Sequence, residues 1–414
     1  MDVQRDQQEE ESIASTSSSS FARYWTGAAI SSFGTAATSV AMPVLVVQSL
    51  DATPFEVGIV NAAQLVPYAF LGLIAGVYTD RWRRKPILVW SSVGRALALG
   101  AIPMLWISGM LQIWNLVGAL LVFGACSVFG FAATQSLLPS LVTRERLVLA
   151  NSRLDQTDAA AQTLGPALGG GLIGLLGAPV AIAIDAISFM VDAALNASVQ
   201  VNETRSDTRT RNLRAEVREG LQWTYRHHTL GPLAVSTHVW FLANGAATTV
   251  LSLFALRFLG LTAFTFGVLL AAFGVASLVG ASLAPRAGSQ FGPRRVIILA
   301  RTAYPIVWVL VAIAPATDAG SALLFMALVL QGLAAGIENA NEMGFWQTLT
   351  PDGLLGRVNA TRRSVNRTLA ALGALTAGLM VGPIGYRTTL AGVILIFAGA
   401  ALIAARSPVR PPNS

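Results

Sequence analysis

The chain has 414 residues, of which 54% are hydrophobic and 12% are charged, and its formal net charge is +7. Charged residues make up roughly a quarter of an ordinary soluble domain. The composition therefore excludes an ordinary soluble domain and indicates that the chain lies in a lipid bilayer. A single cysteine and three histidines exclude an internal disulfide and leave almost no ligands for zinc or haem. No phosphate-binding loop of the form GxxxxGK[ST] occurs, which argues against ATP hydrolysis.

The chain begins with a polar segment and continues as a series of apolar runs. Residues 1–20 are acidic and then serine-rich, without the basic flank of a signal peptide, so we expect a disordered tail. Runs long enough to cross a bilayer, roughly 20 residues each, predict an all-α integral membrane protein with about 12 transmembrane helices. Their continuity excludes the alternating strands of a membrane barrel. The runs cover 24–49, 55–79, 86–107, 112–138, 153–177, 179–200, 233–257, 263–286, 296–314, 320–346, 361–381 and 386–405.

Basic residues gather in alternate loops. The positive-inside rule therefore predicts a protein of the cytoplasmic membrane with both termini in the cytoplasm. This bias also explains the net charge without a nucleic-acid partner. The residues that carry it include Arg81, Arg83, Arg84, Lys85, Arg144, Arg146, Arg205, Arg209, Arg211, Arg214, Arg218, Arg226, Arg294, Arg295 and Arg357.

One connection, 201–232, is much longer than the others. Leu213, Val217 and Leu221 recur there every four residues, which indicates a basic amphipathic helix on the inner surface. We expect this linker to join two six-helix halves, and a short cytoplasmic tail to close the chain. The predicted units are 21–200, 233–406 and the tail 407–414.

An internal repeat supports the two halves. The segment TPFEVGIVNAA at 53–63 aligns without gaps on TAFTFGVLLAA at 262–272, at an offset of 209 residues. Parallel repeats related by an axis along the membrane normal are a transporter architecture, with substrate bound between the halves. Further matches at an offset of 208 pair Asn151, Gly165, Gly177 and Phe189 with Asn359, Gly373, Gly385 and Phe397.

Two motifs make the chain resemble the major facilitator superfamily, over nearly everything after residue 20. The loop pattern GxxxDRxxR[RK] is matched by Gly76, Asp80, Arg81, Arg84 and Lys85. The GPxxGG motif of the superfamily's antiporters is matched by Gly165, Pro166, Gly169 and Gly170. Segments such as IDAISF and REGLQWTYRHH are similar to the enterobactin-exporter and macrolide-efflux branch.

The resemblance implies roles for both motifs. Asp80 would latch the first half to the cytoplasmic end of helix 11 when the transporter faces outward, through charge-assisted hydrogen bonds to Arg362, Arg363 or Arg367. The repeat position of Asp80 is Ser289, so the second half lacks this acid. A loop that only sets topology remains the alternative. The glycine motif lets helices approach closely and would seal an antiporter against leakage, with close packing alone as its alternative.

Acids inside the membrane are costly and mark functional sites. Glu338 and Glu342 lie four apart, on one helix face. Helices 1, 4, 7 and 10 line the cavity in the superfamily fold, so Glu338 is the first choice for a proton site, and pairing with Arg301 is its alternative. We interpret Asp185 and Asp192, in a more peripheral helix, as structural. The proton-coupling candidates are thus Glu338, Glu342 and Asp158.

The predicted cavity wall is weakly polar and partly aromatic, which suits a bulky amphiphilic molecule better than a sugar. We therefore predict a monomeric exporter of drug-like small molecules driven by a proton gradient, without metal or cofactor. Export of a siderophore or another endogenous metabolite, and proton-coupled uptake, stay open; an enzyme or sensor would need a reactive constellation or soluble domain that the sequence lacks. The cavity candidates are Ser32, Thr35, Ser39, Gln64, Gln135, Asn244, Gln331, Asn341 and Trp346.

Overall fold

The fold is all-helical over the residues described. The computed structural model describes residues 2–201 and 213–406, with their side chains except those of 2–18, 73, 76–81, 144, 213–217 and 352. The expected tail 407–414 lies outside this range, as do the side chains of most of the expected tail 1–20. The α-helices are α1 (Asp2–Val44), α2 (Pro54–Ala63), α3 (Val66–Arg81), α4 (Arg84–Ile107), α5 (Ile113–Leu137), α6 (Leu147–Leu176), α7 (Ala178–Ser198), α8 (Leu213–Arg226), α9 (Leu230–Leu253), α10 (Ala263–Phe291), α11 (Pro293–Ile313), α12 (Asp318–Leu349) and α13 (Asp352–Arg406).

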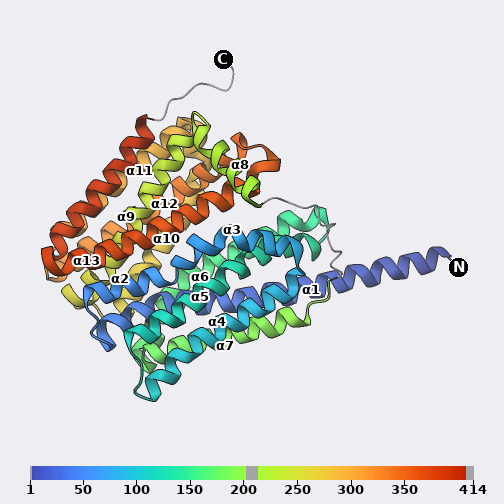
Figure 1. Cartoon of the computed structure of the whole chain (residues 1–414), viewed down its shortest axis with the longest axis horizontal. Coiled ribbons are helices and arrows are strands. Elements are labelled where there is room, and N and C mark those ends of the chain that lie inside the picture. Colours follow the sequence, from blue (N-terminus) through green and yellow to red (C-terminus); the bar gives the residue numbers. More distant parts are fainter. Residues whose placement is uncertain (1, 202–212, 407–414) are drawn as a thin grey trace.

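Figure 1 shows α1–α7 gathered in one part of the molecule and α9–α13 in the other, with α8 beside the second group. Ten of the described helical stretches are long and apolar enough to cross a membrane. The all-helical membrane fold is therefore confirmed, but the count of twelve spans is not.

One of the predicted spans differs in the structure. The run 55–79 is not one helix, because α2 ends at Ala63 and α3 begins at Val66. Pro67 follows this break, and proline both lacks a backbone donor and clashes with the preceding turn. The last two runs lie in α13, which consists of two helices that meet at a kink at Gly385, where φ is 78°; the kink falls between the predicted runs 361–381 and 386–405.

The repeat is visible in local structure as well as in sequence. Thr53 and Thr262, which it pairs, both cap a helix by accepting a backbone hydrogen bond at the side-chain oxygen. Helices α1 and α9 both end in a π-helical turn, Leu45–Ser49 and Phe254–Phe258, again at an offset of 209 residues. The repeat therefore extends beyond the segments that align.

Two pairs of glycines bring the parts together. A Cβ built on Gly58 of α2 would lie 2.9 Å from the Cα of Gly378 in α13, and one built on Gly170 of α6 would lie 3.2 Å from the Cα of Gly267 in α10. The repeat offsets of 209 and 208 relate Gly58 to Gly267 and Gly170 to Gly378. The two contacts are thus equivalent under the pseudo-symmetry, and only glycine allows backbones to approach so closely.

Candidate functional site

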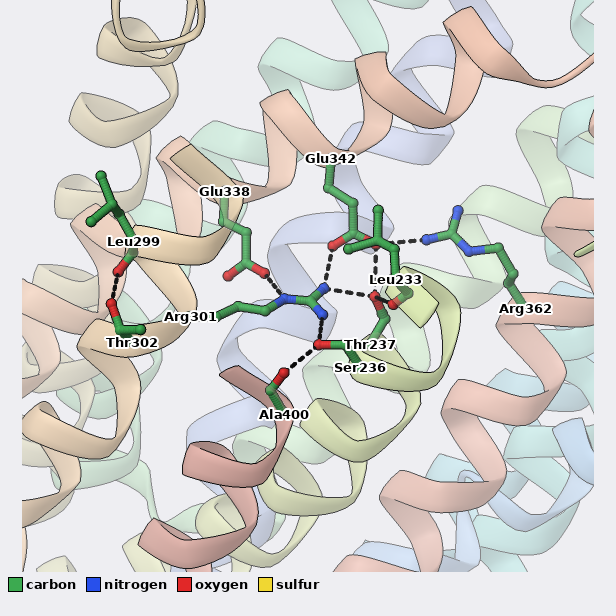
Figure 2. A network of polar contacts seen from close by, with 10 residues as sticks. All are labelled: Leu233, Ser236, Thr237, Leu299, Arg301, Thr302, Glu338, Glu342, Arg362 and Ala400. Atoms are coloured by element: carbon green, nitrogen blue, oxygen red, sulfur yellow. Dashed lines mark hydrogen bonds and ion pairs between the residues drawn. The ribbon is translucent and has the colours of Figure 1, made fainter. Parts of the chain in front are cut away.

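Arg301 lies at the centre of a buried polar network between α9, α11, α12 and α13. Its Nε donates to Glu338 Oε1 at 2.7 Å and its Nη2 to Glu342 Oε2 at 2.7 Å. The hydroxyls of Ser236 and Thr237 accept from the same guanidinium, as Figure 2 shows. Only 1% of Arg301 is exposed. Glu338 thus pairs with Arg301, the contact that the sequence analysis names for it.

Arg362 closes the network on its other side. Its Nη2 donates to Glu342 Oε1 at 2.8 Å (Figure 2), and its guanidinium stacks 3.6 Å from the ring centroid of Trp346. Two arginines and two carboxylates therefore balance in charge here. A buried ion pair needs such compensation, because each unpaired charge costs several kcal/mol.

His238 lies beside this network and is hydrogen-bonded at both ring nitrogens. Nδ1 is 2.6 Å from Asn366 Oδ1, and Nε2 is 2.7 Å from the Tyr225 hydroxyl. Tyr225 belongs to α8, so the linker helix reaches the buried polar cluster through one side chain. With both ring nitrogens hydrogen-bonded, His238 is a satisfied buried polar group.

The latch residues lie in two groups. The side chains of Asp80 and Arg81, like the surroundings of Gly76, lie outside the described part of the structure. Arg84 donates to the Ser136 carbonyl at 3.0 Å, and Lys85 is half-buried. Among the expected partners, Arg362 contacts Glu342 and Arg363 stacks on Phe131. Arg367 lies over the Tyr68 ring, with 5.8 Å between the guanidinium and the ring centroid.

A second buried polar cluster lies in the first group of helices. Asp192 of α7 accepts from Ser92 at 2.6 Å and from Asn196 at 2.8 Å, and Arg95 of α4 lies 3.9 Å away. Asp185, two turns earlier on α7, accepts a hydrogen bond from the Thr38 hydroxyl of α1 at 2.6 Å. Sequence reasoning missed Arg95, although a lone arginine inside an apolar run was a signal that could have found it.

A cavity of about 430 Å³ opens beside this cluster. Its wall combines hydroxyls from α1, one guanidinium, one carboxylate and the phenyl rings of two helices. Because Leu270 and Phe273 come from α10, the cavity lies where the two groups of helices meet. The lining residues are Ser31, Ser32, Thr35, Ala36, Ser39, Arg95, Asp158, Gln162, Pro166, Phe189, Leu270 and Phe273.

Four of the residues expected at a cavity or proton site line this cavity, namely Ser32, Thr35, Ser39 and Asp158. The others lie elsewhere. Gln64 is exposed at the break between α2 and α3, Gln135 is exposed near the end of α5, and Asn244 is half-buried in α9. Asn341 donates to the Ala284 carbonyl at 3.1 Å, while Gln331 and Trp346 are buried in α12.

The glycine motif of α6 packs on two neighbours. A Cβ on Gly169 would lie 2.6 Å from the Cα of Ala37 in α1, and Gly165 contacts Ala36 as closely. On its other face the motif meets α10, where Gly267 touches the Pro166 carbonyl and Gly170. The motif thus lies between the cavity wall and the other group of helices.

Comparisons with known proteins agree with this architecture. The family described as "Transmembrane secretion effector" matches residues 11–414. The chain is 27% identical over 368 residues to the MFS-type transporter y4rN of Sinorhizobium fredii, covering 85% of this chain and 86% of the relative. It is 25% identical over 387 residues to the MFS-type transporter YfiS of Bacillus subtilis, covering 89% of each. It is 26% identical over 215 residues to the multidrug efflux pump Tap of Mycobacterium tuberculosis, covering 49% of this chain and 50% of Tap.

Solved structures show the same fold at low sequence identity. The nucleoside transporter NupG superposes with a TM-score of 0.70 at 12% identity, covering 93% of this chain and 97% of NupG. A bacterial homologue of the iron transporter ferroportin, in an inward-facing state, superposes with a TM-score of 0.72 at 17% identity, covering 94% and 99%. The chain is therefore a multi-pass membrane transporter, not an enzyme, and it belongs to the transmembrane secretion effector family of the major facilitator superfamily.

Proposed function

We propose that this transporter exports amphiphilic organic molecules from the cell in exchange for protons. The observation that carries the proposal is the cavity of about 430 Å³, in which hydroxyls and phenyl rings share the wall with Arg95 and Asp158. An apolar wall with a few polar groups binds a bulky amphiphile without the dense hydrogen bonding that a sugar requires. The similarity to Tap, a multidrug efflux pump, supports this substrate class.

Proton coupling is proposed to run through the Arg301 network. Glu338 and Glu342 share one guanidinium, so a proton taken up by Glu338 would release Arg301 to Glu342 alone. Glu342 also binds Arg362 of α13, so its change of partners acts on the packing of α12 against α13. A proton on one carboxyl would in this way favour one arrangement of these helices over another.

The proposed setting is the cytoplasmic membrane with both termini in the cytoplasm, supported by the basic residues of alternate loops. The protein is proposed to act as a monomer. Asp80 would latch the halves when the transporter faces outward, and Arg363 and Arg367 are the expected partners that stand apart from the Glu342 network.

Substrate class and direction are tested in cells with and without the protein, exposed to ethidium, to a macrolide and to a catecholate siderophore. Cells that carry the protein should accumulate less ethidium and less macrolide, and removal of the proton gradient with an uncoupler should abolish the difference. Movement of the siderophore alone would favour export of an endogenous metabolite. Higher accumulation of any probe would indicate uptake.

Two variants separate the roles within the mechanism. Glu338→Gln should retain ethidium binding but lose the dependence of transport on the proton gradient, and full coupling in this variant would exclude Glu338. Asp80→Asn should slow turnover more than it weakens ethidium binding. Equal losses of turnover and binding would reduce this loop to a topology or folding element.

A further inference from the structure

The two buried polar clusters differ in their charge balance. The cluster around Arg301 holds two carboxylates and two guanidinium groups. The cluster around Arg95 holds the carboxylates of Asp185 and Asp192 but one guanidinium. One acid is therefore in excess among the described residues of this second cluster, inside a helix bundle that crosses the membrane.

The contacts identify Asp185 as the excess acid. It is 0% exposed, and its recorded side-chain contacts within the described part of the chain are two hydroxyls, Thr38 at 2.6 Å and Ser188 at 3.1 Å. Asp192, in contrast, has Arg95 within 3.9 Å besides Ser92 and Asn196. Among the described residues, no cationic group lies within 4.0 Å of the Asp185 carboxylate.

The backbone around Asp185 is built to hold a carboxyl group. Gly34 of α1 lies directly against its Oδ1, so any side chain at that position would displace the carboxyl. Gly27, two turns earlier on α1, makes the same kind of contact with Asp192. Asp192 is thus enclosed between α1 and α4, and Asp185 is buried against α1, a setting in which an uncompensated negative charge is expensive.

Asp185 also lies close to the cavity. Phe189, one turn further along α7, lines the cavity, and so does Arg95. On α1, Thr38 contacts Asp185 while its neighbours Thr35 and Ser39 line the cavity wall. A small movement of α1 against α7 would therefore bring water from the cavity to this carboxyl.

We propose that Asp185 is a second proton-binding site of this transporter, neutral in the enclosed conformation and ionised when α1 moves aside and the cavity water reaches it. The O–H bond of the carboxyl breaks in that step, and the proton passes to water of the cavity. The use of this proton in transport rests on the proposed proton coupling, whereas its binding to Asp185 does not. The titratable and charged groups of its surroundings are Arg95 and Asp192 of the same cluster and, on the cavity wall, Asp158.

The proposal is tested by infrared spectroscopy of the purified full chain in lipid nanodiscs, titrated with pH and without any ligand. A protonated carboxyl has a carbonyl stretch that a carboxylate lacks. We expect this band near neutral pH in the wild type, its loss in Asp185→Asn and its retention in Glu338→Gln. A band that persists unchanged in Asp185→Asn would overturn the proposal.

A second variant keeps the test valid where Asp185→Asn does not fold. Thr38→Val removes one hydrogen-bond partner of the carboxyl and preserves its shape, so the band should remain but shift in frequency. A frequency equal to that of the wild type would overturn the assignment to Asp185. If the band follows these expectations while no proton-coupled transport is found, the proposed function fails and the proton-binding site stands.

Discussion

Arg301 is a buried charge that pairs with two carboxylates at once. Its guanidinium contacts two carboxylates and two hydroxyls. The Ser236 hydroxyl in turn donates a hydrogen bond to the Ala400 carbonyl at 2.6 Å. Removing one partner of a buried ion pair is far more costly than removing the whole pair, because the remaining charge is left without compensation.

Arg301→Met should therefore lower the free energy of unfolding by about 3–5 kcal/mol. The double variant Arg301→Met with Glu338→Met should recover a large part of this loss, since Glu342 and Arg362 still balance each other. Unfolding in mixed micelles, followed by tryptophan fluorescence, measures both. The half-exposed pair of Arg357 with Glu219 is the control, and Arg357→Met should cost about 1 kcal/mol or less. Equal losses for the single and double variants would contradict this account.

At the scale of elements, the imidazole of His227 caps the start of α9 at its junction with α8. His227 Nδ1 accepts the backbone N–H groups of Thr229 at 3.3 Å and Leu230 at 3.1 Å. Burial and then the nearby His228 lower the pKa of His227 below its ordinary value, so folding favours the neutral ring.

This cap should be lost in acid. The unfolded imidazole binds its proton near about pH 6.5, so the contribution of His227 is fully present above that pH and disappears as the pH falls through the lower folded pKa. Hydrogen exchange at the Leu230 amide, corrected for the intrinsic rate, should therefore accelerate on acidification. His227→Gln should remove the pH dependence and His228→Gln should retain it; identical profiles in both variants would refute the cap.

The contact between α6 and α10 depends on glycine on both sides. A Cβ on Gly267 would press on the Pro166 carbonyl and lie 3.1 Å from the Gly170 Cα. Gly267→Ala should therefore destabilise the protein by about 1–3 kcal/mol, the usual cost of overpacking, and slow transport. Thermal unfolding in nanodiscs measures the first effect. Gly174→Ala on the same α6 is the control, because no atom lies within 4 Å of its added methyl. Equal effects of the two substitutions would show that the close contact between α6 and α10 is not needed for stability.

At the scale of the whole molecule, much of the fold could be predicted from the sequence because it is written in local patterns. The apolar runs predict most spans. The repeat relates helix caps, and close contacts between glycines of neighbouring helices, that lie 208 or 209 residues apart. The break before Pro67 was readable in principle, since proline disfavours a continuous helix there. The site was less predictable. Ser92 contacts Asp192 across 100 residues of chain. That Asp185 contacts hydroxyls and Asp192 lies near a guanidinium depends on distances between helices that no local pattern encodes.

The central claim is that proton movement drives the export of amphiphiles. Its most direct test is a proteoliposome that encloses a pH-sensitive dye, with ethidium added on one side and no initial pH gradient. We expect a downhill ethidium flux to drive protons in the opposite direction, with the coupled proton flux lost in Glu338→Gln. Ethidium movement without any proton flux, or proton movement in the same direction as ethidium, would contradict the claim.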